Sequence, residues 1–246
     1  MKDLRFDLYR YQLLPRDRSQ PDLFEILEQK NVLLLKVMTE VHDFSSERIK
    51  VISRCLFEKD SFLFFLFAVS RLQKHETEDF RDELIDTWPD FYVALWNDPL
   101  KQIMAVQERT DAFQQTKAIV NLVEEKINQR LAQNGLRIYF EPLFTKEEFW
   151  KIIATYKDEI KEIEFELITP NMANIAGALS DDLKAFARDT NTSRTKIEIA
   201  SDPDASLRIS RDDLRVGGLV EYASVGGGNI FVKVRGLRNR LTQITQ

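Results

Sequence analysis

The amino-acid sequence predicts an α+β protein built on one or more mixed sheets. Strand-like segments dominate the first half of the chain, whereas helices alternate with strands from about Thr110 onward. Hydrophobic residues make up 43% of the 246 residues, and 17 phenylalanines supply bulky side chains for a sizeable core. We therefore expect a strand-rich N-terminal half over residues 1–108 and an alternating helix–strand C-terminal half over residues 109–246. One continuous domain is the alternative, because no Pro-, Ser- or Gly-rich linker marks the boundary.

The N-terminal half begins with an extended run of apolar and aromatic residues from Leu4 to Pro15. Pro21 is a typical first helical residue and predicts a short helix through Leu23–Leu27. The compact apolar run Val32–Val37 predicts a strand. Two hairpins follow, formed by Ile49–Phe57 with Phe62–Arg71 and by Phe91–Trp96 with Ile103–Gln107.

The C-terminal half alternates between the two kinds of element. Apolar residues spaced by three and four predict a helix over Thr110–Asn134, and Gly135 ends it. The spacing of Thr145 and Glu148 is that of a capping box, which starts the next helix. The remaining expected elements are the strands Leu136–Phe140, Ile163–Ile168, Thr195–Ala200, Leu207–Ile209 and Ile230–Val234, and helices through Leu179–Phe186 and over Asp212–Ala223.

Composition excludes several classes of protein. The most hydrophobic stretch, Phe62–Val69, is eight residues long, whereas a membrane helix needs roughly 20. With no signal-peptide pattern either, we expect a cytoplasmic protein that has no membrane partner. Two histidines and the single Cys55 are too few for a Cys/His zinc site, so no such metal centre is predicted. Cys55 is interpreted as a buried small hydrophobe rather than a nucleophile, and Arg71 with His75 as part of a solvated charged segment rather than an RNase-type pair.

A cluster of carboxylates near a strand end is the weak candidate for catalysis. Glu198, Asp202 and Asp204 offer oxygen ligands for Mg²⁺, and Lys196 offers a positive charge beside them. This combination suits a metal-dependent nuclease or phosphodiesterase. The alternative is an ordinary turn at Asp202–Ala205. No cofactor is predicted, and Mg²⁺ enters only with the nuclease hypothesis. The alternating Glu162, Glu164 and Glu166 are typical of an exposed sheet face.

A glycine run followed by basic residues is the candidate binding segment. Gly226, Gly227 and Gly228 lie between a helix and a strand, which is the reverse of the order found in phosphate-binding loops. Four basic residues then follow within eight positions, without an acidic residue beyond Glu221: Lys233, Arg235, Arg238 and Arg240. The whole chain carries a net charge of −5, so nucleic-acid binding would depend on this local basic edge. A tight turn and an acidic protein partner are the alternatives.

Four short motifs lie along the chain between residues 103 and 228: Ile103–Gln107 before a long helix, Glu147–Trp150, Ile163–Leu167 with Pro170–Asn171, and Tyr222–Gly228. Together they resemble a bacterial family of unknown function associated with mobile elements and phage-defence loci. The resemblance covers roughly residues 90–235 and includes no catalytic motif. It implies a component of a bacterial antiviral defence system and assigns no active site.

The sequence thus favours a non-enzymatic binding component of such a system, acting with other proteins or with further copies of itself. Nucleic acid is a second candidate partner, through the basic C-terminal edge. The alternatives are a metal-dependent nuclease or phosphodiesterase and a structural or oligomerisation subunit. The last has a candidate contact in the aromatic residues Phe62, Phe64, Phe65 and Phe67, although an apolar run of this length also predicts a strand buried on both faces.

Overall fold

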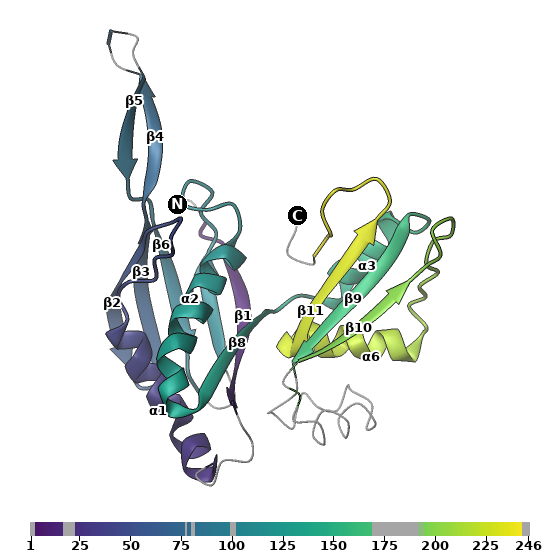
Figure 1. The fold of residues 1–246 in the computed structure, drawn as a ribbon, viewed down its shortest axis with the longest axis horizontal. Coiled ribbons are helices and arrows are strands. Elements are labelled where there is room, and N and C mark those ends of the chain that lie inside the picture. The colour runs from purple at the N-terminus through teal and green to yellow at the C-terminus, as the bar shows by residue number, and fades with distance from the viewer. Residues whose placement is uncertain are drawn as a thin grey trace. The chain divides into compact units, whose positions relative to one another are not determined.

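The computed structural model describes residues 3–16, 23–76, 78–79, 82–98, 102–168, 192 and 194–242. These residues form four α-helices and eleven strands in three sheets (Figure 1). The chain is therefore α+β, as its sequence predicts. Among the described helices, none combines the length and the apolar character that crossing a membrane requires.

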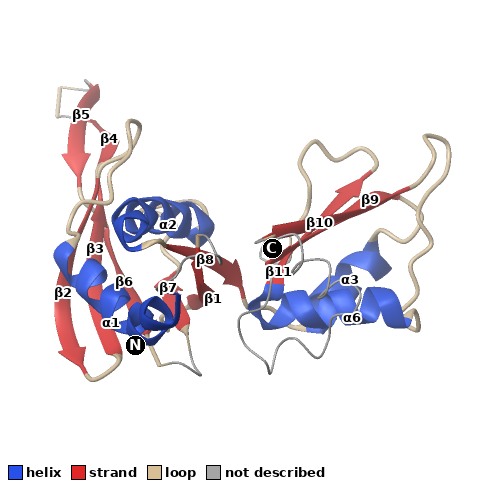
Figure 2. Ribbon diagram, turned by 60° about the horizontal axis from the view of Figure 1, so that its bottom comes forward, coloured by secondary structure: helices blue, strands red, loops and turns tan. Residues whose placement is uncertain are grey.

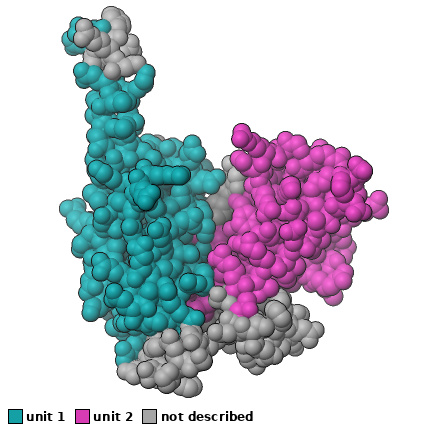
Figure 3. Space-filling model, in the orientation of Figure 1, with its two compact units in different colours: residues 1–8, 15–140 teal, residues 9–14, 141–246 magenta. Residues whose placement is uncertain are grey.

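The chain divides into two compact units (Figure 3). Unit 1 comprises residues 1–8 and 15–140, and unit 2 comprises residues 9–14 and 141–246. The division thus falls after Phe140, whereas the sequence suggested residue 108. The reason is that the long helix and the strand after residue 108 complete the sheet and core of the first unit.

Unit 1 contains most of a six-stranded sheet with the strand order β2-β3-β6-β7-β1-β8; residues 9–14 of β1 and 141–142 of β8 are counted with unit 2. Neighbouring strands are antiparallel from β2 through β3 and β6 to β7. The elements are β1 (Phe6–Pro15), α1 (Leu23–Glu40), β2 (Val51–Lys59), β3 (Phe62–Val69), β4 (Arg71–Glu76), β5 (Asp82–Thr87), β6 (Asp90–Trp96), β7 (Ile103–Gln107), α2 (Thr116–Leu131) and β8 (Leu136–Pro142). Both predicted hairpins, β2–β3 and β6–β7, are confirmed.

The core of unit 1 lies between the sheet and its two helices. Helices α1 and α2 lie on the same side of the sheet (Figures 1 and 2). Phe67 points toward this side, where its ring centroid lies 5.1 Å from that of Phe44, just after α1. Phe91 makes the corresponding contact, 4.8 Å, with Phe113 just before α2. Burial of these large apolar side chains is the main source of stability for the unit.

The predicted strand Val32–Val37 was wrong, because these residues lie inside α1. Inside α1, the buried side chains of Val37 and Met38 follow that of Leu34 by three and four residues, whereas Val32 is 67% exposed. That spacing places one stripe of the helix on the sheet. A short apolar run does not distinguish a strand from a helix, since either buries it equally well.

The long helix and the glycine that ends it lie close to the positions that the sequence predicts. Helix α2 begins at Thr116 rather than Thr110, and a 3₁₀ turn over Ala132–Asn134 extends it. Gly135 ends the helix with φ at 66°, the left-handed conformation that favours glycine.

A hairpin that the sequence did not predict extends unit 1. Strands β4 and β5 pair with each other from Arg71 opposite Thr87 to Glu76 opposite Asp82. They follow β3 and precede β6 directly, and they project beyond the end of the six-stranded sheet (Figure 1). Arg71 does not pair with His75: its Nε donates to the carbonyl of Ala112 at 2.6 Å. We call the β4–β5 hairpin the arm.

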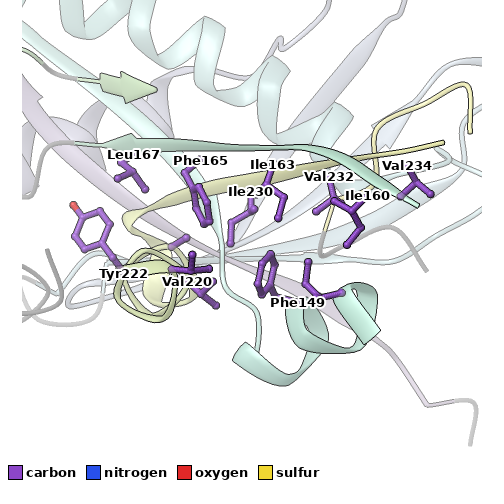
Figure 4. Packing of buried hydrophobic residues seen from close by; sticks show 13 residues of the cluster. Phe149, Ile160, Ile163, Phe165, Leu167, Val220, Tyr222, Ile230, Val232 and Val234 are labelled. Carbon is purple, nitrogen blue, oxygen red and sulfur yellow. The ribbon is translucent and has the colours of Figure 1, made fainter. Parts of the chain in front are cut away.

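Unit 2 is a three-stranded antiparallel sheet in the order β10-β9-β11, packed on helices. Its elements are α3 (Lys146–Thr155), β9 (Ile160–Ile168), β10 (Arg194–Ala200), α6 (Leu214–Tyr222), a π turn over Ala223–Gly227 and β11 (Gly228–Val234). Phe149 of α3 and Val220 of α6 meet Phe165 and Ile230 in the core (Figure 4). The capping box at Thr145 is confirmed, with Glu148 accepting the Thr145 backbone N–H at 2.6 Å.

Two expectations for unit 2 differ from the structure or fall outside it. Leu207–Ile209 is not a strand: Leu207 donates one backbone hydrogen bond to Ile160 at 2.8 Å, but no ladder forms. The predicted helix through Leu179–Phe186 lies outside the described residues.

Candidate functional site

One face of the unit 2 sheet is charged. In strand β9 the odd-numbered Ile163, Phe165 and Leu167 enter the core, so Glu162, Glu164 and Glu166 lie on the opposite face. The register sets Lys196 and Glu198 of β10 beside Glu166 and Glu164, and Lys233 of β11 beside Glu162. Arg194 and Arg240 add further positive charge. We call this surface the charged face: Glu162, Glu164, Glu166, Arg194, Lys196, Glu198, Lys233 and Arg240.

Ion pairs link the strands across the charged face. Lys196 Nζ lies 2.6 Å from Glu166 and 3.1 Å from Glu164. Arg240 bridges Glu162 at 2.6 Å and Glu164 at 3.0 Å. Burial alone raises the pKa of the Glu164 carboxyl, but the hydrogen bonds from Lys196 and Arg240 outweigh burial and hold that pKa below its ordinary value. The face is therefore an internally compensated network.

The predicted metal-binding residues are only partly brought together. The carboxylates that converge are Glu162, Glu164 and Glu198, whose nearest oxygens lie within 4.8 Å of one another. Asp202 and Asp204 instead occupy the exposed turn after β10, where Ala205 donates to the Asp202 carbonyl at 3.0 Å. Lys196, expected to stabilise a reacting phosphate, is engaged by two glutamates. Because lysine and arginine already neutralise Glu162 and Glu164, the arrangement supplies no argument for a metal ion.

The glycine run is buried and has a packing role. Gly226 has φ at +82°, and a Cβ there would lie 2.2 Å from the Arg10 side chain. A Cβ on Gly227 would meet the ring of Tyr222 at 2.4 Å, and one on Gly228 the carbonyl oxygen of Glu166 at 2.1 Å. These glycines thus let the chain pass close to its neighbours. They offer no exposed backbone to a ligand.

Ion pairs compensate two of the four charges of the basic C-terminal edge. Lys233 pairs with Glu162 at 3.4 Å, and Arg240 pairs with two glutamates, so their charges are compensated within unit 2. Arg235 and Arg238 are exposed and make no ion pair with any described residue. Two uncompensated charges form a much smaller basic surface than the four suggested by the sequence.

Glu164→Gln tests the charged network through its pH dependence. Because the pKa of Glu164 is lowered by folding, its ionised form stabilises the protein above the ordinary value of 4.5, and this contribution is lost as the pH falls through the lower folded-state pKa. We expect the variant to melt at a lower temperature than the wild type at pH 7, and the gap to narrow between about pH 5 and about pH 3.

The control for this prediction is Glu147→Gln. Glu147 forms an ion pair with Arg211 at 3.1 Å in which both side chains are more than half exposed, so its loss changes little. Thermal melts of all three proteins across the pH range give the comparison. A gap for Glu164→Gln that stays constant over that range would contradict the network.

A second surface lies on the six-stranded sheet of unit 1, on the side away from its helices. Residues directly opposite each other on paired strands share a face, so the register of β2, β3 and β6 defines this surface. We call it the outer face: Ile52, Arg54, Phe57, Lys59, Phe62, Phe64, Leu66, Ala68, Asp90, Tyr92, Ala94 and Trp96. Most of these residues are apolar, although both helices cover only the other side (Figure 2).

Aromatic rings gather at one end of the outer face. The ring of Phe62 lies 4.6 Å from Trp96 and 6.3 Å from Phe57. Phe64 stacks on Tyr92 at 5.2 Å. Phe57 and Trp96 remain 50% and 42% exposed. The rings therefore contact one another and still present a substantial apolar surface to solvent.

The sequence predicted only part of the outer face. Of the four phenylalanines it singled out, Phe62 and Phe64 lie on the outer face, whereas Phe65 and Phe67 are buried in the core. Phe57, Tyr92 and Trp96 were missed. The signal was present in the unbroken apolar run of β3, since a strand with one solvated face normally alternates apolar with polar residues.

Cys55 is half-buried in β2, opposite Phe65. Burial raises the pKa of its thiol, which favours the unreactive protonated form. Cys55 is thus less buried than the sequence suggested, because it lies on the edge strand β2.

No family model matches the chain, and none of the curated proteins matches it either.

Proposed function

We propose that this chain is a non-enzymatic binding component of a protein assembly, and that the outer face of unit 1 is its binding surface. The observation that carries the proposal is the apolar, aromatic character of a sheet face that neither helix of the unit covers. Exposed clusters of this kind mark protein–protein contacts in soluble proteins.

The energy available from covering the outer face is large. An aromatic side chain presents about 200 Å², and burial of apolar surface gains about 25 cal/mol per Å². Covering the exposed half of Phe57 alone is therefore worth about 2.5 kcal/mol. Trp96 and Ile52, which are 42% and 46% exposed, add contributions of similar size. Aromatic residues at the centre of an interface supply much of the binding energy in known complexes.

Charge favours a protein partner over nucleic acid. Residues 1–8 and 15–140, which make up unit 1, contain 19 basic and 23 acidic side chains. A surface that binds a phosphate backbone needs an excess of positive charge. In unit 2, the compensation of Lys233 and Arg240 by glutamates weakens the basic C-terminal edge as a nucleic-acid site. Membership of a phage-defence system stays a prediction from the sequence resemblance.

Site-specific photo-crosslinking in cells tests the proposal. A benzophenone amino acid is placed at Phe57 or at Trp96, and the control carries it at Leu214 of α6, which is 91% exposed. We expect a discrete protein adduct from both outer-face positions and none from position 214. Adducts of equal yield at all three positions, adducts to nucleic acid, or no adduct at Phe57 and Trp96 would reject the outer face as a protein-binding surface.

A further inference from the structure

Apolar side chains of the arm are exposed to solvent in the part of unit 1 that the structure describes. Leu72 and Leu84 are 70% and 66% exposed, and Ile85 is 42% exposed. In the arm, Leu72 pairs with Asp86 and Lys74 pairs with Leu84. These four residues share one face of the ribbon, so the two leucines are diagonal neighbours on that face. An isolated two-stranded ribbon is only marginally stable in water and usually needs further strands or a helix to pack against.

The arm is also strongly acidic. The segment from Arg71 to Thr87 contains six acidic and three basic residues. Because the arm carries negative charge and exposed leucines, it is suited to bind a surface that is both basic and apolar.

The outer face has the opposite charge. Its cationic side chains are Arg54 and Lys59, which are exposed and make no ion pair with any described residue. Its one carboxylate, Asp90, is already paired with Arg109 at 2.7 Å. Apolar surface with positive charge at its margin thus faces solvent on the same unit that carries an apolar, acidic arm.

The two surfaces also agree in length. Six-residue strands make the arm about 20 Å long, and the eight residues of β3 make the outer face about 26 Å long at 3.3 Å per residue. The arm leaves the sheet as a direct continuation of β3 and β6 and points away from it (Figure 1), so it does not cover its own outer face.

From these observations we infer that the occupant of the outer face is a second copy of this chain, whose arm lies across it. The inference rests on the proposed function and names the partner of that same surface. In a two-fold dimer each arm would cover the other copy's outer face, so the same contact forms twice. Leu72 and Leu84 would pack on the aromatic rings, and carboxylates of the arm would meet Arg54 and Lys59.

The mass of the protein in solution, measured by light scattering over a range of concentrations, tests the inference. We expect the wild type to be a dimer. An arm variant, Leu72→Asp with Leu84→Asp, and a face variant, Phe57→Ser with Trp96→Ser, are each expected to weaken dimerisation by about 30-fold or more. Leu214→Asp, the control, is expected to dimerise like the wild type.

Mixing the two variants gives the decisive result. The arm variant keeps an intact face and the face variant an intact arm, so an equimolar mixture restores one of the two contacts. We expect heterodimers in the mixture at concentrations where each variant alone is a monomer. A mixture that stays monomeric, or an arm variant that dimerises like the wild type, overturns the role of the arm.

Charge reversal keeps the test independent of folding defects in the face variant. Arg54→Glu with Lys59→Glu is expected to weaken the dimer, and Asp86→Lys in the arm of its partner, on the same face as Leu72 and Leu84, to restore part of the affinity. A wild-type chain that is monomeric at every concentration overturns the second copy as partner. That result leaves the proposed function standing, because photo-crosslinking to a different protein would still support it.

Discussion

Gly228→Ala is expected to destabilise unit 2 by about 3 kcal/mol, one of the two largest effects we predict. A Cβ at this position would lie 2.1 Å from the carbonyl oxygen of Glu166 and 2.9 Å from Cα of Leu167. Both atoms belong to the backbone of β9, the central strand, so neither moves without disturbing the pairing of β9 with β11. Chemical denaturation followed by circular dichroism gives the free energy of unfolding.

Gly217→Ala is the matched control for this prediction. Gly217 lies within α6, and a Cβ there would meet nothing within 4 Å. Alanine favours the helix over glycine by about 0.5–1 kcal/mol, so this variant is expected to be slightly more stable than the wild type. Equal stabilities for the two alanine variants would contradict the close packing at Gly228.

Phe67→Ala is expected to cost unit 1 about 3–5 kcal/mol, whereas Phe57→Ala on the neighbouring strand costs about 1 kcal/mol or less. Phe67 is fully buried between the sheet and its helices, with its ring near those of Phe44, Phe65 and Phe91. Phe57 is 50% exposed on the outer face and touches only the edge of the aromatic group there. The pair therefore separates the core face of the sheet from the outer face.

Denaturation of both variants in the isolated protein gives the comparison. Because Phe57 lies on the outer face and Phe67 in the core, Phe57→Ala is expected to lower the affinity for the partner, whereas Phe67→Ala is expected to lower the free energy of unfolding. Comparable losses of folding stability for both substitutions would show that the outer face belongs to the core of the chain.

The local elements of the fold were largely predictable from sequence. Hairpins β2–β3 and β6–β7, the Gly135 terminator and the Thr145 capping box depend on residues close together in the chain, so their patterns carry the information. The failures were of another kind. Val32–Val37 is apolar enough for either a strand or a helix, and only its packing against the sheet decided the outcome.

The charged face shows why the candidate site was harder to predict. Lys233 and Glu162 are 71 positions apart in sequence and become neighbours only through the pairing of β11 with β9. Read singly, Lys233 and Arg240 belong to a basic edge, whereas in the fold they neutralise an acidic strand. The outer face was missed for a related reason, because the run Phe62–Val69 does not tell which of its two sides the helices cover.

Hydroxyl-radical footprinting of Trp96 tests most directly whether the outer face is a protein interface. Its indole is 42% exposed in the isolated chain, and Trp150 of α3, a partly buried residue of unit 2, provides an internal reference away from the outer face and the arm. Oxidation is compared between cells in which the assembly is intact and the purified chain diluted until it is monomeric. A partner on the outer face predicts at least a fivefold fall in Trp96 oxidation in cells, of the order expected for a residue at the water-excluded centre of an interface. Equal oxidation of Trp96 in the two states would contradict the central claim.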